Sequence, residues 1–423
     1  MNKNIPRRRI FLSCFACSPG WGSEPGVGWR WLEELSKSYD VVLVTHAYFR
    51  ERIDTELASH PMEGLLGVHY FAPNAFGISP DIQINSRLYY IWWQWCLGGY
   101  VKGLLKSQSF DLIHHLTWGT FRFPTFLGRK GVPLVMGPLG GGDVAPMRLY
   151  AGLPFVTQAR EWVRDVSLRF AKFDPLAMWG PMAASLVLCK TEDTLRALPA
   201  SIQARAVIAP EIGAPVVDLS SRQAKSATSS PFRLLFAGTL SGVKGIVLAI
   251  GAVHSLTKAG YDVTLDIAGK GPLRDFLLGE IDKLGLSKQV CLLGMLPREE
   301  LMALYGQADL FVFPSLHDSS GNVVLESLSR GLPVICLDLG GPKYYVTPQC
   351  GVIVSTLNRT SKQVEQALAE SIADLIDQPN KLREMSDGAV QQAHIQTWAA
   401  RVNNAYALIE QRLGWQTKSN TTD

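Results

Sequence analysis

Residues 309–333, DLFVFPSLHDSSGNVVLESLSRGLP, indicate most directly how this 423-residue chain folds. Residues 309–314 are a short apolar run that predicts a buried strand. The small residues at 319–321 supply turn chemistry, and Asn322 can cap a helix. Residues 323–330 are predicted to form that helix. Strand, loop and helix in this order are typical of a parallel sheet covered by helices.

Two acidic residues flank the loop that follows this strand. Asp318 and Glu326 are separated by seven residues, one on each side of the predicted helix start. The loop lies at the carboxyl end of a parallel strand, where open α/β sheets bind their ligands. Because N–H groups at a helix N-terminus attract anions, the sequence predicts an anion site flanked by the two carboxylates.

The same alternation of strand and helix runs through both halves of the chain. Strands are predicted in the first half at RRIFLSCFA, DVVLVTH, GVHYFAP, FDLIHHL, PLVMGP, ASLVLC and RAVIA, and in the second half at RLLFAGTL, DVTLDIAG, QVCLLG, DLFVFP and PVICLD. The expected fold class is therefore α/β, with two doubly wound Rossmann-like domains that face each other across a cleft.

A segment rich in serine and charge, LSSRQAKSATSSP, separates the halves and is typical of a linker. The expected division is an N-terminal domain over residues 1–217, a linker over 218–231 and a C-terminal domain over 232–396. Residues 397–415 are expected to form a helix that packs back on the N-terminal domain, and residues 416–423 a flexible tail.

The composition indicates a globular protein. Hydrophobic residues make up 47% of the chain and charged residues 18%, which excludes wholesale disorder, and the formal net charge is only +4. No basic stripe interleaved with aromatic residues occurs, so nucleic acid is not an expected partner. The seven cysteines lie mostly in apolar runs, as reduced core residues do. Cys14 and Cys17 form a lone CxxC, for which a core role is favoured over zinc or redox chemistry, and no metal is predicted.

The N-terminal stretch PRRRIFLSCFACSPG contains paired arginines before an apolar run, as an export signal does. The apolar part is too short, so a first β-strand led by solvated arginines is the favoured interpretation. No run approaches the roughly 20 apolar residues of a membrane span. The expected location is the cytoplasm.

Glycine-rich turns follow three strands of the second half, in GTLSGVKG, IAGKGP and LLGMLP. Lys244 lies at a helix start, where a cation is favourable if it meets a bound phosphate, and the alternative is a solvated lysine on a relaxed turn. Loops at the carboxyl edge of a parallel sheet gather at one crevice. Lys244, Gly269, Gly294 and residues 317–326 are therefore expected to converge.

These motifs, followed by ELMALYGQADLFVFPS, the acidic-x7-Glu spacing and GLPVICLDLGGP, resemble the C-terminal domain of the family-4 retaining glycosyltransferases with the GT-B fold, the glycosyl transferases group 1. The resemblance covers residues 232–354 and extends weakly to the first half. It implies metal-independent transfer of a hexosyl group from a nucleotide-diphosphate sugar to a hydroxyl group, with no cofactor. The chain has no Asp-x-Asp element, which agrees with metal independence.

Carried onto this sequence, the resemblance implies that Glu326 binds the ribose, that Asp318 faces the donor sugar and that Lys244 pairs with the diphosphate. Asp318 and Lys244 are the expected catalytic residues on this side. The expected donor-binding residues are Gly22, Gly238, Thr239, Lys244, Gly294, Asp318, Ser320, Gly321, Asn322, Val323, Val324 and Glu326.

Two of these positions depart from the pattern of the family. Thr239 stands where an arginine is usual, and Asp318 is one methylene shorter than the usual glutamate. Lys270 and Arg274 are candidates to replace the missing cation. An active enzyme remains the favoured interpretation, since Lys244, Glu326 and the helix N-terminus are present.

The first half has its own candidates. The family resemblance implies that the glycine-rich loop around Gly22 faces the donor phosphates and the acceptor, and a flexible surface loop is the alternative. His114 and His115 end a predicted strand, where the family often has a histidine that faces the acceptor, and both are candidate catalytic residues. Adjacent strand positions point in opposite directions, so only one can face the cleft, and for each a structural role is the alternative. Gly140, Gly141 and Gly142 are expected on the acceptor side.

The segment LYYIWWQWCLGGYVKGLL is strongly aromatic. It is predicted either to lie on a membrane surface, on the cytoplasmic face of the inner membrane, or to form a buried helix. The first reading would suit a lipid-linked acceptor in bacterial surface polysaccharide assembly, and a glycan acceptor is the other expectation. A nucleotide-sugar epimerase or phosphorylase on the same fold and a non-catalytic nucleotide-sugar-binding partner are the alternative functions.

Overall fold

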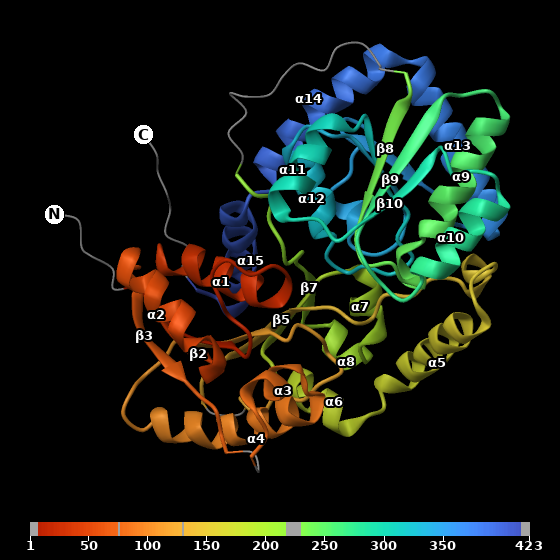
Figure 1. Ribbon diagram of the computed structural model, residues 1–423. Helices are drawn as coiled ribbons and strands as arrows, with labels where there is room; N and C mark the ends of the chain where they lie inside the picture. The colour runs from red at the N-terminus through yellow and green to blue at the C-terminus, as the bar shows by residue number, and fades with distance from the viewer. Residues whose placement is uncertain (1–6, 75–76, 129–130, 217–229, 416–423) are drawn as a thin grey trace. The chain divides into compact units, whose positions relative to one another are not determined.

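The computed structural model describes residues 7–74, 77–128, 131–216 and 230–415 (Figure 1). The chain forms two compact units. Unit 1 comprises Met1–Gly142, Ser167–Ile212 and Trp398–Asp423, and unit 2 comprises Asp143–Val166 and Gly213–Thr397. The predicted linker, apart from its last two residues, and the predicted tail lie outside the described residues. Asp143–Val166, expected in the N-terminal domain, groups with unit 2.

A parallel sheet of seven strands forms the centre of unit 1, in the order β3-β2-β1-β4-β5-β6-β7. The strands are β1 (Arg9–Cys14), β2 (Asp40–Thr45), β3 (Leu65–Tyr70), β4 (Leu112–Thr117), β5 (Leu134–Leu139), β6 (Leu186–Cys189) and β7 (Ala206–Ile208). All the strands predicted in the first half are present. Both β4 and β5 are buried along their whole length, because helices cover a doubly wound parallel sheet on both faces.

Helices lie on both faces of this sheet, with α1 and α15 on one face and α4 on the other (Figure 1). The helices of unit 1 are α1 (Ser23–Ser36), η1 (Ala47–Phe49), α2 (Arg50–Ser59), α3 (Pro80–Asn85), α4 (Arg87–Leu104), α6 (Pro175–Ala183), α7 (Glu192–Ala197), α8 (Ala200–Gln203) and α15 (Trp398–Leu413). The helix α5 (Phe155–Ala171) is shared by the two units. The last helix, α15, contacts α1 although the whole of unit 2 separates them in sequence.

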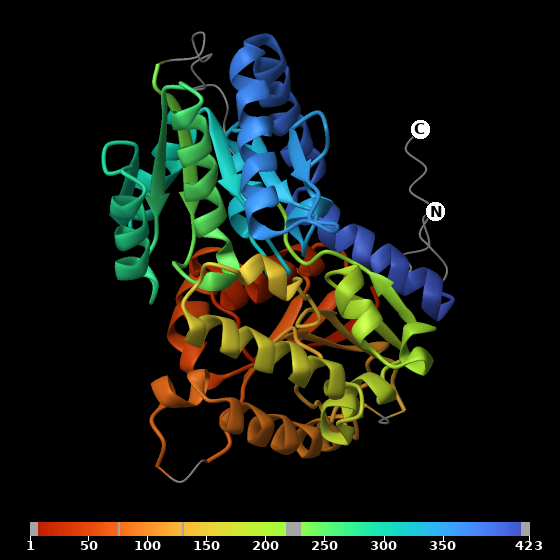
Figure 2. The ribbon, with the colours of Figure 1, turned by 90° about the vertical axis from the view of Figure 1, so that its right-hand side faces the viewer.

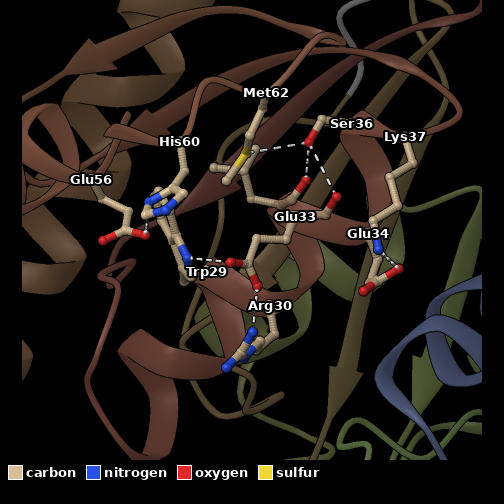
Figure 3. Close-up of polar contacts among 10 residues, drawn as sticks. Trp29, Arg30, Glu33, Glu34, Ser36, Lys37, Glu56, His60 and Met62 are labelled. Atoms are coloured by element: carbon tan, nitrogen blue, oxygen red, sulfur yellow. Dashed lines mark hydrogen bonds and ion pairs between the residues drawn. The ribbon is translucent and has the colours of Figure 1, made fainter. Parts of the chain in front are cut away.

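The helix α1 follows the glycine-rich loop after β1. Gly26 allows the helix to pack closely on that loop, since a Cβ atom there would lie 2.0 Å from the backbone oxygen of Trp21. Within the helix, Glu33 accepts hydrogen bonds from Trp29 Nε1 at 2.8 Å and from Arg30 Nη1 at 2.9 Å (Figure 3). Each such i,i+3 or i,i+4 pair stabilises a helix by roughly 0.2–0.5 kcal/mol.

A second parallel sheet, of six strands, forms the centre of unit 2, in the order β10-β9-β8-β11-β12-β13. The strands are β8 (Phe232–Ala237), β9 (Val263–Ala268), β10 (Val290–Gly294), β11 (Leu310–Phe313), β12 (Val334–Leu337) and β13 (Gly351–Val354). The sequence pattern predicts β8 to β12 but not β13. This strand has four residues, pairs only with β12 and is partly exposed, so its pattern is weak.

Helices also cover both faces of the second sheet, with α9 and α13 on one face and α11, α12 and α14 on the other (Figure 1). The helices are η2 (Met147–Tyr150), η3 (Gly242–Lys244), α9 (Ile246–Lys258), α10 (Arg274–Lys283), α11 (Arg298–Gln307), α12 (Asn322–Ser329), η4 (Pro342–Tyr344), α13 (Ser361–Asp377) and α14 (Pro379–Ile395). Lys244 therefore ends a short 3-10 turn just before α9, rather than starting the helix as predicted.

Both sheets reverse their strand order at one point. The reversal lies between β1 and β4 in unit 1 and between β8 and β11 in unit 2. Loops that leave such a pair of strands run to opposite faces of the sheet and leave a crevice, in which doubly wound proteins bind ligands. Lys244 follows β8 and Asp318 follows β11, so both lie at the switch point of unit 2.

Candidate functional site

Lys244 and Asp318 meet at the switch point of unit 2. Lys244 Nζ lies 2.6 Å from Asp318 Oδ2, and the two side chains are 20% and 17% exposed. Gly245 makes this approach possible, because its φ is 64° and a Cβ atom there would lie 1.9 Å from the backbone oxygen of Pro314. The ammonium group also lies 5.6 Å from the ring centroid of Phe313. A lysine is thus held in a defined position at the end of the two central strands.

Asp318 also shapes the loop before α12. Its Oδ1 accepts hydrogen bonds from the N–H groups of Ser320 at 3.0 Å and Gly321 at 2.8 Å. An aspartate suits these contacts, since its short side chain reaches the backbone two and three residues ahead. Burial acts to raise the pKa of Asp318, but Lys244 and the two N–H donors outweigh it and hold the pKa below its usual value. The carboxylate is therefore charged and holds both the lysine and the loop.

The helix α12 begins at Asn322, and Gly321 occupies its N-cap position with a φ of 76°. Asn322 is thus the first helical residue and not the cap that the sequence predicted. None of the described side chains caps this helix, whereas Thr360 caps α13. A helix start without a side-chain cap presents backbone N–H groups and partial positive charge, which suits an anion.

Glu326 lies further along α12 and has protein partners. Its Oε1 lies 3.5 Å from Arg298 Nη2, and the side chain of Arg298 is 66% exposed. Burial raises the pKa of Glu326, although Arg298 and Tyr305 act against it. A ribose hydroxyl would have to share this carboxylate with Arg298, whose side chain is 66% exposed and can turn away into solvent.

The glycine turns of unit 2 lie together at this edge of the sheet, as the sequence analysis expected. The N–H group of Gly238 donates to Ala268 O at 2.9 Å, and that of Gly269 donates to Gly294 O at 2.7 Å. Thr239 is exposed beside them. The carboxyl ends of β8, β9 and β10 therefore form a continuous backbone surface next to Lys244.

The candidates for the cation that Thr239 replaces differ in position. Lys270 is exposed on the turn after β9, while Arg274 is 59% exposed on its side chain and pairs with Asp275 at 3.3 Å. Neither is held toward the Lys244–Asp318 pair by a contact among the described residues.

A further arginine, Arg164 of α5, lies close to this pair and was missed by the sequence analysis. Its guanidinium group donates to Nε2 of His317, the neighbour of Asp318, and bonds Glu161 at 2.7 Å. Burial, followed by the charges of Arg164 and Lys244, lowers the pKa of His317 to about 4, so its imidazole is neutral and accepts the hydrogen bond. No sequence signal joins Arg164 to a loop 153 residues away.

The two histidines of unit 1 are core residues. His114 Nδ1 lies 2.9 Å from the Tyr406 hydroxyl, and its Nε2 lies 2.6 Å from Gly137 O. His115 likewise has both ring nitrogens bonded, with Tyr90 and Ser13 as partners at 3.0 Å and 3.1 Å.

This geometry corrects the catalytic role expected of His114 and His115. They are 0% and 2% exposed, so no acceptor can reach either ring. Burial lowers the pKa of His114 to about 4 and that of His115 to about 3, which leaves both imidazoles neutral. The structural alternative accounts for both side chains.

The glycines expected on the donor and acceptor sides of unit 1 differ in exposure. Gly22 is exposed at the N-cap position of α1. Gly140 and Gly142 are buried, and Gly142 donates to Thr194 Oγ1 at 3.2 Å, while Gly141 is half-buried. The GGG segment is therefore a packed loop after β5, and its contact with an acceptor stays a prediction.

A buried charge cluster at the carboxyl edge of unit 1 was missed by the sequence analysis. Lys190 follows β6 directly, and its Nζ lies 2.6 Å from Glu211 Oε2 and 4.0 Å from Glu24 Oε1. The side chains of Lys190 and Glu211 are 5% and 3% exposed. Burial raises the pKa of Glu24 to about 7, with Lys190 opposing and Glu211 adding to the shift. The available signal was a charged residue at the end of an apolar run, in LVLCK and AVIAPE.

The comparisons with known proteins agree with this geometry. Residues 219–392 match the family model described as Glycosyl transferases group 1. The 2-deoxystreptamine glucosyltransferase of Streptomyces kanamyceticus is 29% identical over 144 residues, which are 34% of this chain and 36% of that protein. The D-inositol 3-phosphate glycosyltransferase of Corynebacterium diphtheriae is 27% identical over 225 residues, 50% and 51% of the two chains. The chain thus matches between about a third and a half of the length of these relatives.

Solved structures resemble the chain over almost its whole length. TarM has a TM-score of 0.62 at 12% identity, with coverage of 96% of this chain and 99% of TarM. Anabaena HepE in complex with UDP has a TM-score of 0.58 at 18% identity, again with 96% and 99% coverage. These likenesses confirm the expected fold class. The chain therefore carries a glycosyl transferases group 1 domain within the two-sheet GT-B fold.

Proposed function

We propose that this protein moves a hexosyl group from a nucleotide-diphosphate sugar to a hydroxyl group of a glycan or lipid-linked acceptor, with retention of configuration and without a metal ion. The observation that carries the proposal is the Lys244–Asp318 pair at the switch point of unit 2, with the α12 start beside it. A fixed cation and a helix N-terminus together provide the chemistry of a diphosphate site. The group 1 domain over residues 219–392 supports the same assignment.

In this proposal Lys244 stabilises the negative charge that develops on the leaving nucleotide diphosphate. Asp318 holds the lysine in place and borders the donor sugar, and Glu326 binds the ribose once Arg298 has turned away. Arg164 is a candidate for the second cation, through its contact with His317. The remaining donor contacts are assigned as predicted to Gly22, Gly238, Thr239, Gly294, Ser320, Gly321, Asn322, Val323 and Val324.

The biological setting belongs to the same proposal. The acceptor is a glycan or a lipid-linked sugar, and the reaction is a step in bacterial surface polysaccharide assembly on the cytoplasmic face of the inner membrane. Two structural neighbours support this setting. They are WaaG, described as a glycosyltransferase involved in lipopolysaccharide biosynthesis, with a TM-score of 0.52, and the lipopolysaccharide outer core galactosyltransferase WaaB, with a TM-score of 0.59. The UDP and UDP-glucose complexes of HepE support a uridine nucleotide as the donor.

A thermal-shift series tests the donor site. Because a ligand that binds only the folded protein raises its apparent stability, UDP, GDP or ADP and the matching sugar are expected to raise the melting temperature. The corresponding nucleoside, which lacks the diphosphate, is expected to raise it far less, since the site is built around phosphate charge. Equal shifts with nucleoside and nucleotide, or no shift with any nucleotide, would contradict the proposal.

A non-catalytic nucleotide-sugar-binding protein is the second candidate, because both carboxylate oxygens of Asp318 are bonded within the protein. An epimerase or phosphorylase on the same fold is the third. Chromatography of the sugar products separates them. Binding without any product favours the second candidate, a changed donor sugar or a sugar phosphate favours the third, and a glycosylated acceptor supports the transferase.

A further inference from the structure

The helix α4 has two apolar faces. One face packs on the sheet of unit 1 through residues such as Trp93 and Leu97, both 0% exposed. The other carries Leu88, Trp92 and Trp95, which are 81%, 42% and 62% exposed. These three residues follow the i, i+4, i+7 spacing of one helix stripe. A surface helix normally directs polar side chains to solvent along this stripe, so the exposed tryptophans need a different explanation.

The helix α6 continues the exposed apolar surface. Leu176, Trp179 and Met182 are 45%, 49% and 55% exposed and share one side of the helix. Phe126 joins the two helices, since its ring centroid lies 5.1 Å from that of Trp95 and 6.1 Å from that of Trp179. Figure 1 shows both helices on the same side of the sheet. We name this surface the aromatic face, and it comprises Leu88, Trp92, Trp95, Leu176, Trp179 and Met182.

Exposed cations border the aromatic face. Residues 82–110 contain Arg87, Lys102 and Lys106 and no aspartate or glutamate. All three basic side chains are exposed. The solvent side of α4 therefore combines indole rings with positive charge.

The border beside α6 is also cationic. Residues 167–185 contain Arg169 and Lys172, both exposed, against Asp174 as their one acidic residue. Asp174 caps α6, because its Oδ1 accepts hydrogen bonds from the N–H groups of Leu176 at 2.9 Å and Ala177 at 3.2 Å. The border therefore has an excess of positive charge on both sides of the aromatic face.

We propose that the aromatic face docks on a membrane that contains anionic lipids. Tryptophan rings favour the boundary between headgroups and acyl chains, and lysine and arginine beside them meet the phosphate groups. Among the described residues, no helix has the length and hydropathy of a membrane span. The inference deepens the membrane setting of the proposed function, and its observations come from unit 1 and not from the donor site.

The charges decide between a membrane and a second copy of the chain. Two copies that paired through this face about a twofold axis would place the same surface against itself. The cations of both copies would then meet with few carboxylates between them, and like charges at close range repel. An anionic lipid surface instead neutralises the cationic border while it covers the apolar centre.

Sedimentation with lipid vesicles tests the inference on the full chain. The protein is expected to bind vesicles of phosphatidylcholine and phosphatidylglycerol, to bind phosphatidylcholine alone much more weakly, and to lose affinity at high salt. The double variant Trp95→Ser, Trp179→Ser is expected to bind about tenfold more weakly. Lys102→Ser with Lys106→Ser is expected to reduce both the affinity and its salt dependence.

The matched control is Leu357→Ser, because Leu357 is 74% exposed but lies in unit 2. Its vesicle binding is expected to equal that of the wild type, as is that of Lys244→Ala, which alters the donor site alone. Circular dichroism and melting temperatures verify that each variant is folded.

Two results would overturn the inference. The first is binding that the tryptophan variant leaves unchanged, or no binding to any vesicle. The second is a concentration-dependent dimer that the same variant dissociates, without vesicle binding, which would assign the face to a second copy. Loss of vesicle binding with intact transfer to a soluble acceptor would leave the proposed function standing, and the reverse result would leave the membrane contact standing.

Discussion

The two sheets have the same strand order around their switch points but carry different arrangements of charge at their carboxyl edges. In unit 2 a single lysine faces a single aspartate at 2.6 Å, and both side chains are about a fifth exposed. In unit 1 a lysine that is 5% exposed lies between two glutamates, at 2.6 Å and 4.0 Å. The same topology therefore supports a balanced, accessible pair in one unit and a buried cluster with excess carboxylate in the other.

The difference teaches which of the two lysines can meet an anion. A diphosphate needs a cation whose charge it can share and N–H groups that it can reach, and Lys244 with the α12 start offers both. Lys190 already serves two carboxylates, and a phosphate group would meet repulsion from both. Lys244 in unit 2 is thus expected to bind a ligand, whereas Lys190 in unit 1 is expected to stabilise the fold.

The variant Lys244→Ala is expected to lower the transfer rate by about 10²–10³-fold, as removal of one fixed transition-state donor does elsewhere. Its melting temperature should change little, because an ion pair with partly exposed side chains contributes modestly to stability. The measurement is product formation with the nucleotide sugar that gives the largest thermal shift. Lys288→Ala, an exposed lysine of unit 2, is the matched control, and equal rates for both variants would remove Lys244 from the site.

The variant Lys190→Met is expected to lower the free energy of unfolding by about 3 kcal/mol, because it leaves the buried charge of Glu211 without its lysine. Adding Glu211→Gln is expected to restore most of this loss. Urea unfolding followed by circular dichroism measures both variants beside Lys244→Met, whose loss should stay below about 1 kcal/mol. Similar losses at Lys190 and Lys244 would erase the distinction between the two lysines.

The variant His114→Gln is expected to lower the free energy of unfolding by about 2 kcal/mol, because the buried Tyr406 hydroxyl and Gly137 carbonyl lose a well-placed partner. The transfer rate of the folded variant should stay near that of the wild type. Urea unfolding and the transfer assay check the two halves of this prediction. A stable variant with a large loss of rate would restore the catalytic role that the structure disfavours.

The variant Glu24→Gln is expected to change how stability depends on pH. The pKa of Glu24 is raised from 4.5 to about 7, so between these values the folded chain binds more protons than the unfolded chain. The stability that protonated Glu24 contributes is therefore lost as the pH rises through 7. Glutamine does not titrate, so this loss is absent from the variant. From pH 5 to pH 8 the free energy of unfolding of Glu24→Gln should therefore rise relative to that of the wild type by at most about 1 kcal/mol.

Melting curves at pH 5 and pH 8 measure this effect. Glu33→Gln is the matched control, since Glu33 lies on the same helix and bonds Trp29 and Arg30 there (Figure 3). If the melting temperatures of Glu24→Gln and the wild type differ by the same amount at both pH values, Glu24 titrates normally. That result would contradict the raised pKa assigned to Glu24 in the cluster.

Much of the fold was predictable, because apolar runs separated by turn residues mark buried parallel strands. The short edge strand β13 was not, since its four residues carry little pattern. The meeting of Lys244 with the loop of Asp318 was predictable from topology alone, because both follow strands at one edge. The cap of α12 was assigned one residue too late, since Gly321 takes the N-cap position with a left-handed backbone and donates its N–H group to Asp318 Oδ1.

The interpretation of the histidines failed for a physical reason. A strand pattern predicts which residues alternate between the faces of a sheet, but not what packs over each face. Tyr406 reaches His114 from a helix 292 residues later, and such a contact leaves no trace in the local sequence. The cluster of Lys190 with Glu24 and Glu211 was missed for the same reason, because its members follow different strands of the sheet.

The sequence by itself determined the two α/β units, the site edge of unit 2 and the glycosyltransferase resemblance, because hydrophobic periodicity and glycine turns are local signals. Only the tertiary structure decided which charged residues are accessible, which histidines are buried and which helix faces stay exposed. Burial and charge pairing depend on contacts between segments that are distant in the chain. Lys244 and Lys190 both follow a buried strand, and the groups packed around each one determine whether it can meet a ligand.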